Sequence, residues 1–240
     1  MESTESRQFI YKKHLYYQNT NGKTTTYKPW LGDLFAFMYD RIMEKSVFPK
    51  KFKGDMKKHM QILKEEFKSV HNENILEVAT GSGNAVYFLN PDNDYTGTDI
   101  STGLLRQAYK NFRKHKFPNV RLYVAEAAHL PFAKNSFDRV ICNLSLNFFP
   151  EIEPFLNELQ RVLKPGGIFF CSVPIPEKTD PKAKIHGKLY TTEEIKRHLK
   201  QSHFNFHKKD PENGALKNMK PVFSPMYSAG AETLAWNLST

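Results

Sequence analysis

Cysteine is scarce in this 240-residue chain, which contains only two. Cys142 and Cys171 both lie inside apolar segments, where a reduced cysteine packs as a small hydrophobic side chain. Neither has a histidine or a second cysteine at the spacing that metal ligands show. We therefore expect neither a disulfide nor a zinc site, and no metal cofactor.

Long apolar runs are absent as well. No stretch of about 18 apolar residues that could cross a bilayer occurs in the sequence. The first residues, "MESTESRQ", lack the basic and then apolar pattern of a secretory signal. Apolar residues make up 40% of the chain and charged residues 25%, as in ordinary folded domains. We expect a cytoplasmic protein that folds as a single compact unit.

Acidic residues are outnumbered, with 25 Asp and Glu against 35 Lys and Arg, and the net charge is +10. The excess lies in the flanks: residues 1–70 hold 14 basic and 8 acidic residues, residues 71–177 hold 10 and 11, and residues 178–220 hold 11 and 5. Basic surfaces attract nucleic acid, anionic membranes or acidic small molecules. A solvated lysine-rich surface with no specific partner explains the same counts.

The first 70 residues predict an arm followed by two helices. Residues 7–28 mix aromatics with lysines and contain a turn at Asn21-Gly22, which is typical of a loosely held arm. A dense apolar segment, residues 31–48, indicates the first helix. The second helix is indicated by apolar residues at steps of four and three, namely Met56, Met60, Leu63, Phe67 and Val70.

From residue 71 onward, strand-like and helix-like segments alternate. The pattern predicts strands over 74–79, 94–99, 120–125, 136–142 and 167–173, and helices over 84–90, 101–115 and 151–163. Residues 126–135 show no clear helical period. Strands separated by helices favour an α/β fold with a parallel sheet covered on both faces.

The C-terminal part adds one more helix and late strands. Thr191 and Glu194 stand three residues apart, as in a capping box that begins a helix. Aromatic and apolar stretches around 204–207 and 227–236 could supply antiparallel edge strands.

The stretch "ILEVATGSGNA", residues 75–85, joins the first core strand to a helix through Gly81 and Gly83. In an open parallel sheet, this turn lies beside the ligand. A dinucleotide site needs a third glycine three residues after the second, and Val86 stands there, which disfavours a diphosphate. Asp99 ends the next strand in "YTGTDIS", where a carboxylate can accept both hydroxyls of a ribose. A helix N-cap or an ordinary turn acid is the alternative for Asp99.

Four motifs together resemble the class I SAM-dependent methyltransferases: "LEVATGSGNA", "YTGTDIS", "AEAAHLPFAKNSFDRVI" and "ELQRVLKPGG", over about residues 74–173. The similarity is closest to the small-molecule branch that includes ubiquinone and menaquinone biosynthesis methyltransferases and related lipid enzymes, whose helix before the core resembles "YDRIM". The resemblance implies S-adenosyl-L-methionine (SAM) as cofactor. It also implies a Rossmann-like doubly wound sheet, mostly parallel with an antiparallel edge strand and helices on both faces. Residues 1–70 would form the N-terminal arm and helical cap, and residues 71–240 the methyltransferase domain.

The resemblance also implies a role for each motif residue near the methionine and ribose. Gly81 and Gly83 would let the loop pass beside the methionine portion of SAM, and Glu77 would support that loop and the ligand's ammonium through water. Asp99 would bind the ribose hydroxyls. The family usually writes Gly-Cys-Gly where this chain has Ala79-Thr80-Gly81, so Ala79 is a conservative departure at the same turn.

Five further residues would complete the cofactor site by the same resemblance. Ile100 would pack on the adenine, Glu126 would face the adenine amino group, and the Ala127 amide would donate to the ring. Asn143 would offer its backbone carbonyl near the ammonium, and Tyr39 could close over the ligand. The family usually has Asp where Glu126 stands, which keeps the charge but lengthens the side chain.

The implied reaction is an in-line attack by an acceptor atom on the sulfonium methyl. Because a sulfonium is an activated leaving group, alignment of the acceptor supplies much of the acceleration, and a dedicated base is optional. This agrees with a sequence that shows no nucleophile elbow, carboxylate pair or metal cluster. His129 and His186 are weak candidates for a base, and a surface or structural role is the better interpretation of each.

The acceptor is less well indicated. Enzymes that methylate base amino groups carry an Asn/Asp-Pro-Pro-aromatic turn after the fourth strand, whereas residues 143–146 here read Asn-Leu-Ser-Leu. The acceptor pocket of this fold is usually roofed by the two stretches that hold the positive charge here. We expect a small or lipid-like acceptor, amphiphilic or anionic, with peripheral contact to an anionic membrane. An RNA-binding protein or RNA methyltransferase, and a non-catalytic SAM-binding partner subunit, are the alternatives.

Overall fold

The computed structural model describes residues 8–27, 45, 49–50, 55–174, 187–202, 204–206, 208–209, 216–217 and 231–238. The expected helix over residues 31–48 lies outside these ranges, apart from residue 45. Tyr39 and His186 lie outside the described residues as well.

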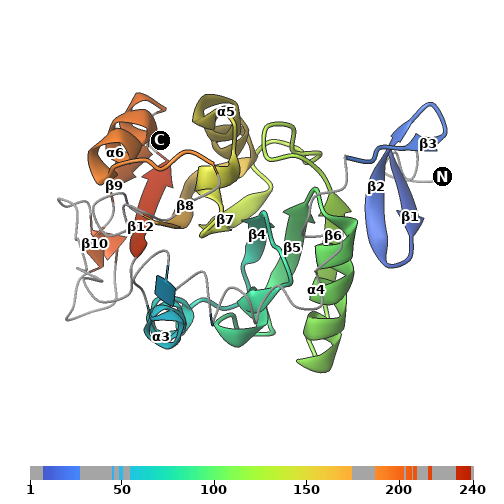
Figure 1. Cartoon of the computed structure of the whole chain (residues 1–240), viewed down its shortest axis with the longest axis horizontal. Coiled ribbons are helices and arrows are strands. Elements are labelled where there is room, and N and C mark those ends of the chain that lie inside the picture. The colour runs from blue at the N-terminus through green and yellow to red at the C-terminus, as the bar shows by residue number, and fades with distance from the viewer. Residues whose placement is uncertain are drawn as a thin grey trace.

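One ten-stranded sheet forms the centre of the molecule, in the order β1-β2-β6-β5-β4-β7-β8-β12-β9, with β3 paired to β2 (Figure 1). The strands from β2 to β8 in this order run parallel, while β1, β3, β12 and β9 pair antiparallel. This confirms the expected mostly parallel sheet with antiparallel strands at its edges. The strands are β1 Phe9–Lys12, β2 Leu15–Thr20, β3 Lys23–Thr24, β4 Asn74–Val78, β5 Asp94–Asp99, β6 Val120–Val124, β7 Phe137–Asn143, β8 Leu163–Pro174, β9 Phe204–Phe206 and β12 Ala231–Leu238, with β10 Lys208–Lys209 and β11 Leu216–Lys217 forming a separate pair.

Helices cover both faces of the sheet, as expected (Figure 1). Their bounds are α3 Met56–Phe67, α4 Thr102–Lys114, α5 Ile152–Val162 and α6 Thr192–Gln201, with 3₁₀ helices η3 Asn84–Tyr87 and η4 Leu146–Phe148. Successive strand residues point to opposite faces, so Ile75 of β4 packs with α3 and α4 whereas Leu76 packs with α5 and α6. The two buried layers of side chains hold the sheet between the helices and fix where its strand ends lie.

Side chains that satisfy the first backbone amides fix where three helices begin. Asp55 accepts hydrogen bonds from the second and third amides of α3, and Ser101 accepts one from Leu104 at the start of α4. Thr191 and Glu194 form the predicted capping box at the start of α6.

The N-terminal arm differs from the prediction, because residues 9–24 are not a loose segment but three strands of the sheet. Lys13 and His14, both with left-handed φ, form the two-residue turn of the β1–β2 hairpin. β2 then pairs in parallel with β6, and its Leu15 and Tyr17 are buried in the core. The burial of these two alternating side chains provides the hydrophobic energy that holds the arm. The expected turn at Asn21-Gly22 is confirmed between β2 and β3.

The expected helix over 84–90 is shortened to one turn of 3₁₀ helix, residues 84–87. Pro91 follows closely, and a proline disfavours helical geometry in the residue before it. Residues 126–135 contain no helix, as expected from their lack of period. The late strands expected around 204–207 and 227–236 are confirmed as β9 and β12.

Candidate functional site

The carboxyl ends of β6, β5, β4 and β7 lie next to one another. The row of these strand ends is called the C-terminal edge of the sheet, or simply the edge. The pairs Val78–Thr98 and Asp99–Val124 are in register, so these strands end at similar heights. The chain adds β5 and β6 on one side of β4 and then β7 and β8 on the other. The order therefore reverses beside β4, and ligands of open α/β sheets bind in the crevice at such a reversal.

The loop after β4 holds the two predicted glycines, and they serve different purposes. Both have left-handed φ, of 58° at Gly81 and 82° at Gly83. Among the described residues, no atom lies within 4 Å of the place where a Gly81 side chain would begin, so these residues leave the backbone there open to a ligand. At Gly83 the same position lies 2.9 Å from the Cα of Ala108 on α4. Gly83 is thus needed for the contact between loop and helix.

Ala79 also has left-handed backbone geometry, with a φ of 58°. This conformation costs an L-residue about 1–2 kcal/mol and is the normal place for glycine. The strained turn is held by the next residue, since the amide of Thr80 donates to the carbonyl of Thr98 at 2.9 Å. The geometry therefore accounts for the glycine that the family usually has at position 79.

Asp99 connects the loop to the start of α4. Its Oδ2 accepts a hydrogen bond from the Gly81 amide at 2.9 Å, and its Oδ1 accepts one from the Ser101 amide at 2.8 Å. Because both oxygens are held, the half-buried carboxylate has one fixed orientation at the edge of the sheet. The next side chain, Ile100, is 40% exposed although it is apolar. A fixed carboxylate beside an uncovered apolar side chain suits a ribose and an adenine respectively.

Glu77 lies beneath the loop and is buried. It accepts a short hydrogen bond from the hydroxyl of Tyr95, which also lies 3.1 Å from the hydroxyl of Thr80. Burial raises the pKa of Glu77 to about 8, although the Tyr95 hydrogen bond acts in the opposite direction. At neutral pH this carboxyl group is therefore largely protonated. Glu77, Tyr95 and Thr80 together support the loop from below, and a water link from Glu77 to the ligand stays a prediction.

The residues expected around the adenine follow β6. The side chain of Glu126 is about half exposed, and Ala127 is partly buried against the core. His129 is on the same turn: its amide donates to the Glu126 carbonyl at 3.1 Å, and its side chain is 78% exposed. Three strand spacings, about 14 Å, separate β6 from β7. His129 belongs to the exposed turn after β6, where the adenine is expected, whereas the methionine portion is expected at the end of β7, so this position does not favour His129 as a base.

Asn143 ends β7 and is held by several side chains. Its Oδ1 lies 3.0 Å from Nε2 of His59 and accepts a hydrogen bond from the Ser172 hydroxyl at 2.5 Å. Its backbone carbonyl accepts from the Ser145 hydroxyl at 2.9 Å. His59 belongs to α3 and is fully buried, and this burial lowers the pKa of the imidazole more than the Asn143 hydrogen bond raises it. The imidazole is therefore neutral at physiological pH.

The sequence interpretation missed His59, Tyr95, Thr80 and Ser172 as parts of this edge. A signal for His59 existed, because it stands four residues before Leu63 and eight before Phe67 on one row of the helix. Those three are the buried residues of α3. Met56 and Met60, which were assigned to the apolar stripe, are only partly buried.

The described residues contain neither a candidate metal centre nor a membrane-spanning helix. These residues hold no cluster of three or more metal-ligating side chains. None of the helices formed by these residues is long and apolar enough to cross a bilayer.

Comparisons with known proteins agree with this geometry. Residues 76–171 match the family model of a methyltransferase domain. The ubiquinone/menaquinone biosynthesis C-methyltransferase UbiE of Rickettsia bellii is 39% identical over 108 residues, which cover 42% of this chain and 44% of that protein. A demethylmenaquinone methyltransferase of Staphylococcus aureus is 33% identical over 161 residues, or 60% of this chain and 64% of that one. The chain thus spans about half to under two thirds of these relatives' lengths.

A solved structure extends the agreement to the fold. The SAM-dependent methyltransferase from Aquifex aeolicus superposes with a TM-score of 0.60 at 16% identity, over 85% of this chain and 98% of that one. At this identity the likeness concerns the fold alone. The family match, the sequence relatives and the shared fold together show that the chain contains a class I SAM-dependent methyltransferase domain, distantly related to the ubiquinone and menaquinone methyltransferases.

Proposed function

We propose that this protein transfers a methyl group from SAM to a small or lipid-like acceptor. The observation that carries the proposal is the link between Gly81 and Asp99. The open backbone at Gly81 leaves room for the cofactor, and the carboxylate of Asp99 is fixed beside it. The names of the two relatives, both quinone methyltransferases, support a small acceptor.

In this proposal the residues at the carboxyl ends of the strands bind SAM and orient it. Asp99 holds the ribose, Ile100 and Glu126 flank the adenine, and the carbonyl of Asn143 faces the amino-acid end. When bound, SAM supplies a methyl group on a positively charged sulfur, which is already activated for attack. The protein therefore has to align the acceptor and exclude water, which are the entropic contributions to catalysis. His59 is fully buried, and this burial lowers the pKa of its imidazole, so it is a weak base that is shielded from an acceptor.

Residues 187–190, which precede α6, lie beside η4, and in this proposal they contribute to the roof of the acceptor pocket. The amide of Lys188 donates to the carbonyl of Asn147 on η4 at 2.8 Å. The ammonium of Lys188 lies 4.6 Å from the centre of the Tyr190 ring. Tyr190 is buried and Lys188 is exposed, so the ammonium of Lys188 is the group of this pair that an acceptor can reach, which favours an anionic acceptor.

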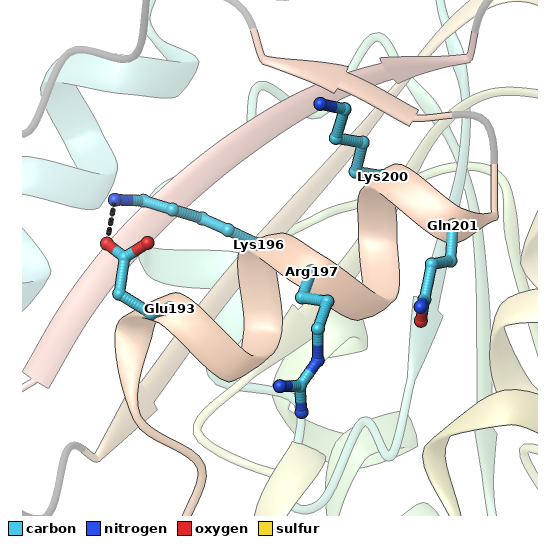
Figure 2. A pocket seen from close by; sticks show the side chains of 5 residues that line it. All are labelled: Glu193, Lys196, Arg197, Lys200 and Gln201. Atoms are coloured by element: carbon cyan, nitrogen blue, oxygen red, sulfur yellow. Dashed lines mark hydrogen bonds and ion pairs between the residues drawn. The ribbon is translucent and has the colours of Figure 1, made fainter.

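The basic surface of α6 supports a proposed contact with an anionic membrane. Lys196, Arg197 and Lys200 line a hollow of about 500 Å³ together with Glu193 and Gln201. Figure 2 shows Arg197 and Lys200 pointing in opposite directions, which suits a broad charged surface better than a closed anion site. Sedimentation with neutral and anionic liposomes at low salt tests this contact, and absence from both pellets would refute it.

The acceptor class is tested by methyl transfer from labelled SAM into a cell extract that is then separated into lipid, small-molecule, protein and RNA fractions. We expect label in the lipid or small-molecule fraction. Label confined to RNA or protein would overturn the proposed acceptor class. Saturable SAM binding without transfer to any fraction would indicate the non-catalytic partner subunit instead.

A further inference from the structure

His59 connects a helix that precedes the methyltransferase core to the strand end at which the amino-acid portion of SAM is expected. The imidazole is fully buried, and its Nε2 lies 3.0 Å from Oδ1 of Asn143, 84 residues later in the chain. A buried polar side chain is costly unless it makes hydrogen bonds. Burying a histidine here, in a row that otherwise carries Leu63 and Phe67, therefore calls for a reason beyond packing.

The hydrogen-bond directions can be assigned from the partners. The Ser172 hydroxyl accepts from the Leu144 amide at 3.2 Å and donates to Oδ1 of Asn143. Since Oδ1 is an acceptor, the Nε2 of the neutral His59 must carry the proton and donate to it. Two donors, one on α3 and one on the neighbouring strand β8, thus fix the Asn143 amide.

The backbone around Asn143 is fixed by the same group of residues. Leu144 has a left-handed φ of 55°, and its amide donates to the carbonyl of Ser172 at 2.8 Å. The Ser145 hydroxyl donates to the Asn143 carbonyl at 2.9 Å. This carbonyl is the one expected beside the ligand's ammonium. Ser172 binds both the Leu144 amide and the Asn143 side chain, so the backbone and side-chain contacts at this strand end share one partner.

We propose that His59 is a positioning residue for the amino-acid end of SAM, which acts through the Asn143 side chain and couples packing of α3 to cofactor binding. The proposal rests on the proposed function, because it takes SAM as the ligand. His59 does not touch the cofactor in this scheme. Its loss should therefore weaken recognition of the methionine portion and leave recognition of adenosine unchanged.

The test compares two ligands by isothermal titration calorimetry on the full chain. S-adenosyl-L-homocysteine carries the amino-acid end, whereas 5′-methylthioadenosine has the same adenosine without it. For His59→Leu we expect about tenfold weaker binding of S-adenosyl-L-homocysteine, the order of effect of a buried hydrogen-bond partner left unsatisfied, with methylthioadenosine within about twofold of wild type. His59→Gln, whose amide can still donate near the Nε2 position, should restore most of the affinity.

Two further variants separate positioning from a general loss of stability. Met60→Ala removes a partly buried side chain of the same helix without touching Asn143, so it should lower the melting temperature while both affinities stay near wild type. Ser172→Ala removes the second donor to Asn143 and should reproduce the selective loss seen with His59→Leu. Where an acceptor is available, the KM for SAM should rise in His59→Leu more than kcat falls.

Hydrogen exchange provides a readout independent of affinity. Binding of S-adenosyl-L-homocysteine should slow exchange of the α3 amides in wild type and in His59→Gln, but not in His59→Leu. Equal losses for both ligands in His59→Leu, or wild-type affinity for both, would overturn the positioning role. If wild-type protein itself bound neither ligand, the proposed function would fail before the role of His59 was reached.

Discussion

The backbone amide of Gly81 donates a hydrogen bond to Oδ2 of Asp99 at 2.9 Å, which joins the loop after β4 to the end of β5. The other oxygen of the same carboxylate accepts from the Ser101 amide. One side chain therefore fixes the loop, the start of α4 and its own orientation.

Asp99→Asn should weaken SAM binding by at least about tenfold, because an amide oxygen replaces only one of two charged acceptors and hydrogen bonds to charged groups are the stronger ones. Calorimetry with SAM measures the loss. Asp94→Asn is the matched control, since Asp94 begins the same strand at its other end and bonds Asn119 at the surface. Similar affinity in the two variants would argue against Asp99 as the ribose ligand.

Substitution of the two loop glycines by alanine should affect different properties: stability at Gly83 and SAM affinity at Gly81. Gly83→Ala places a methyl group 2.9 Å from Ala108 and should destabilise the fold by about 1–3 kcal/mol, the usual cost of overpacking. The new methyl group of Gly81→Ala meets no atom of the described part of the chain within 4 Å, so the protein should fold with about 1–2 kcal/mol of backbone strain while losing SAM affinity. Urea denaturation and SAM titration of both variants check this. Normal SAM affinity in folded Gly81→Ala would contradict the open approach at that residue.

Because the backbone at Ala79 is strained, the stability of variants at this position should depend on the side chain that replaces alanine. Ala79→Gly should leave stability unchanged or raise it by about 0.5 kcal/mol, because relief of left-handed strain slightly exceeds the entropy cost of a glycine. Ala79→Val should lose about 2 kcal/mol, since a β-branched residue with positive φ is a severe outlier. Chemical denaturation of the three proteins tests the order. A valine variant as stable as wild type would show that the turn is not strained.

The raised pKa of Glu77 predicts that the protein becomes less stable as pH rises. Its pKa rises from 4.5 in the unfolded chain to about 8 in the fold. Between these values the unfolded chain has released the proton that the folded protein keeps, so the free energy of unfolding should fall as pH rises, by on the order of 5 kcal/mol in total. Glu77→Gln keeps an acceptor for Tyr95 and should lose this slope.

Urea denaturation of wild type and Glu77→Gln at pH 5, 6, 7 and 8 measures the difference directly. Other groups titrate in the same range, among them His59, whose lowered pKa destabilises the fold as pH falls below the ordinary histidine value. Because His59 is present in both proteins, its contribution cancels in the comparison. Parallel curves for the two proteins would mean that Glu77 ionises normally in the fold.

The core strands were predictable because each is a short apolar run with turn residues at its ends. β5 matched its predicted bounds, β4 and β6 each ended one residue early, and β7 was shifted by one residue at both ends. β8 was predicted over 167–173 but runs from Leu163 to Pro174, so it begins four residues before its expected start. The cofactor edge followed from the same reasoning, since parallel strands place the residues after their carboxyl ends together. Local patterns therefore located Asp99 and the glycine loop correctly within the sheet.

Contacts between residues far apart in sequence were not predictable. The hydrogen bond between His59 and Asn143 spans 84 residues, and nothing in either neighbourhood indicates the other. Similarly, the alternation in residues 9–20 resembles that of any exposed hairpin, and the strand that it joins is encoded about a hundred residues later. Local propensity cannot specify such pairs, because tertiary burial decides them.

The parallel pairing of Tyr16 with Tyr123 has a consequence for biogenesis. The β1–β2 hairpin leaves the ribosome early, but β6, with which β2 pairs, is synthesised much later. During synthesis β2 is therefore without its partner strand. Contacts of such long separation are formed late and slowly. A shortened protein that begins after residue 24 would expose the unpaired backbone of β6, and a bare strand edge of this kind invites aggregation.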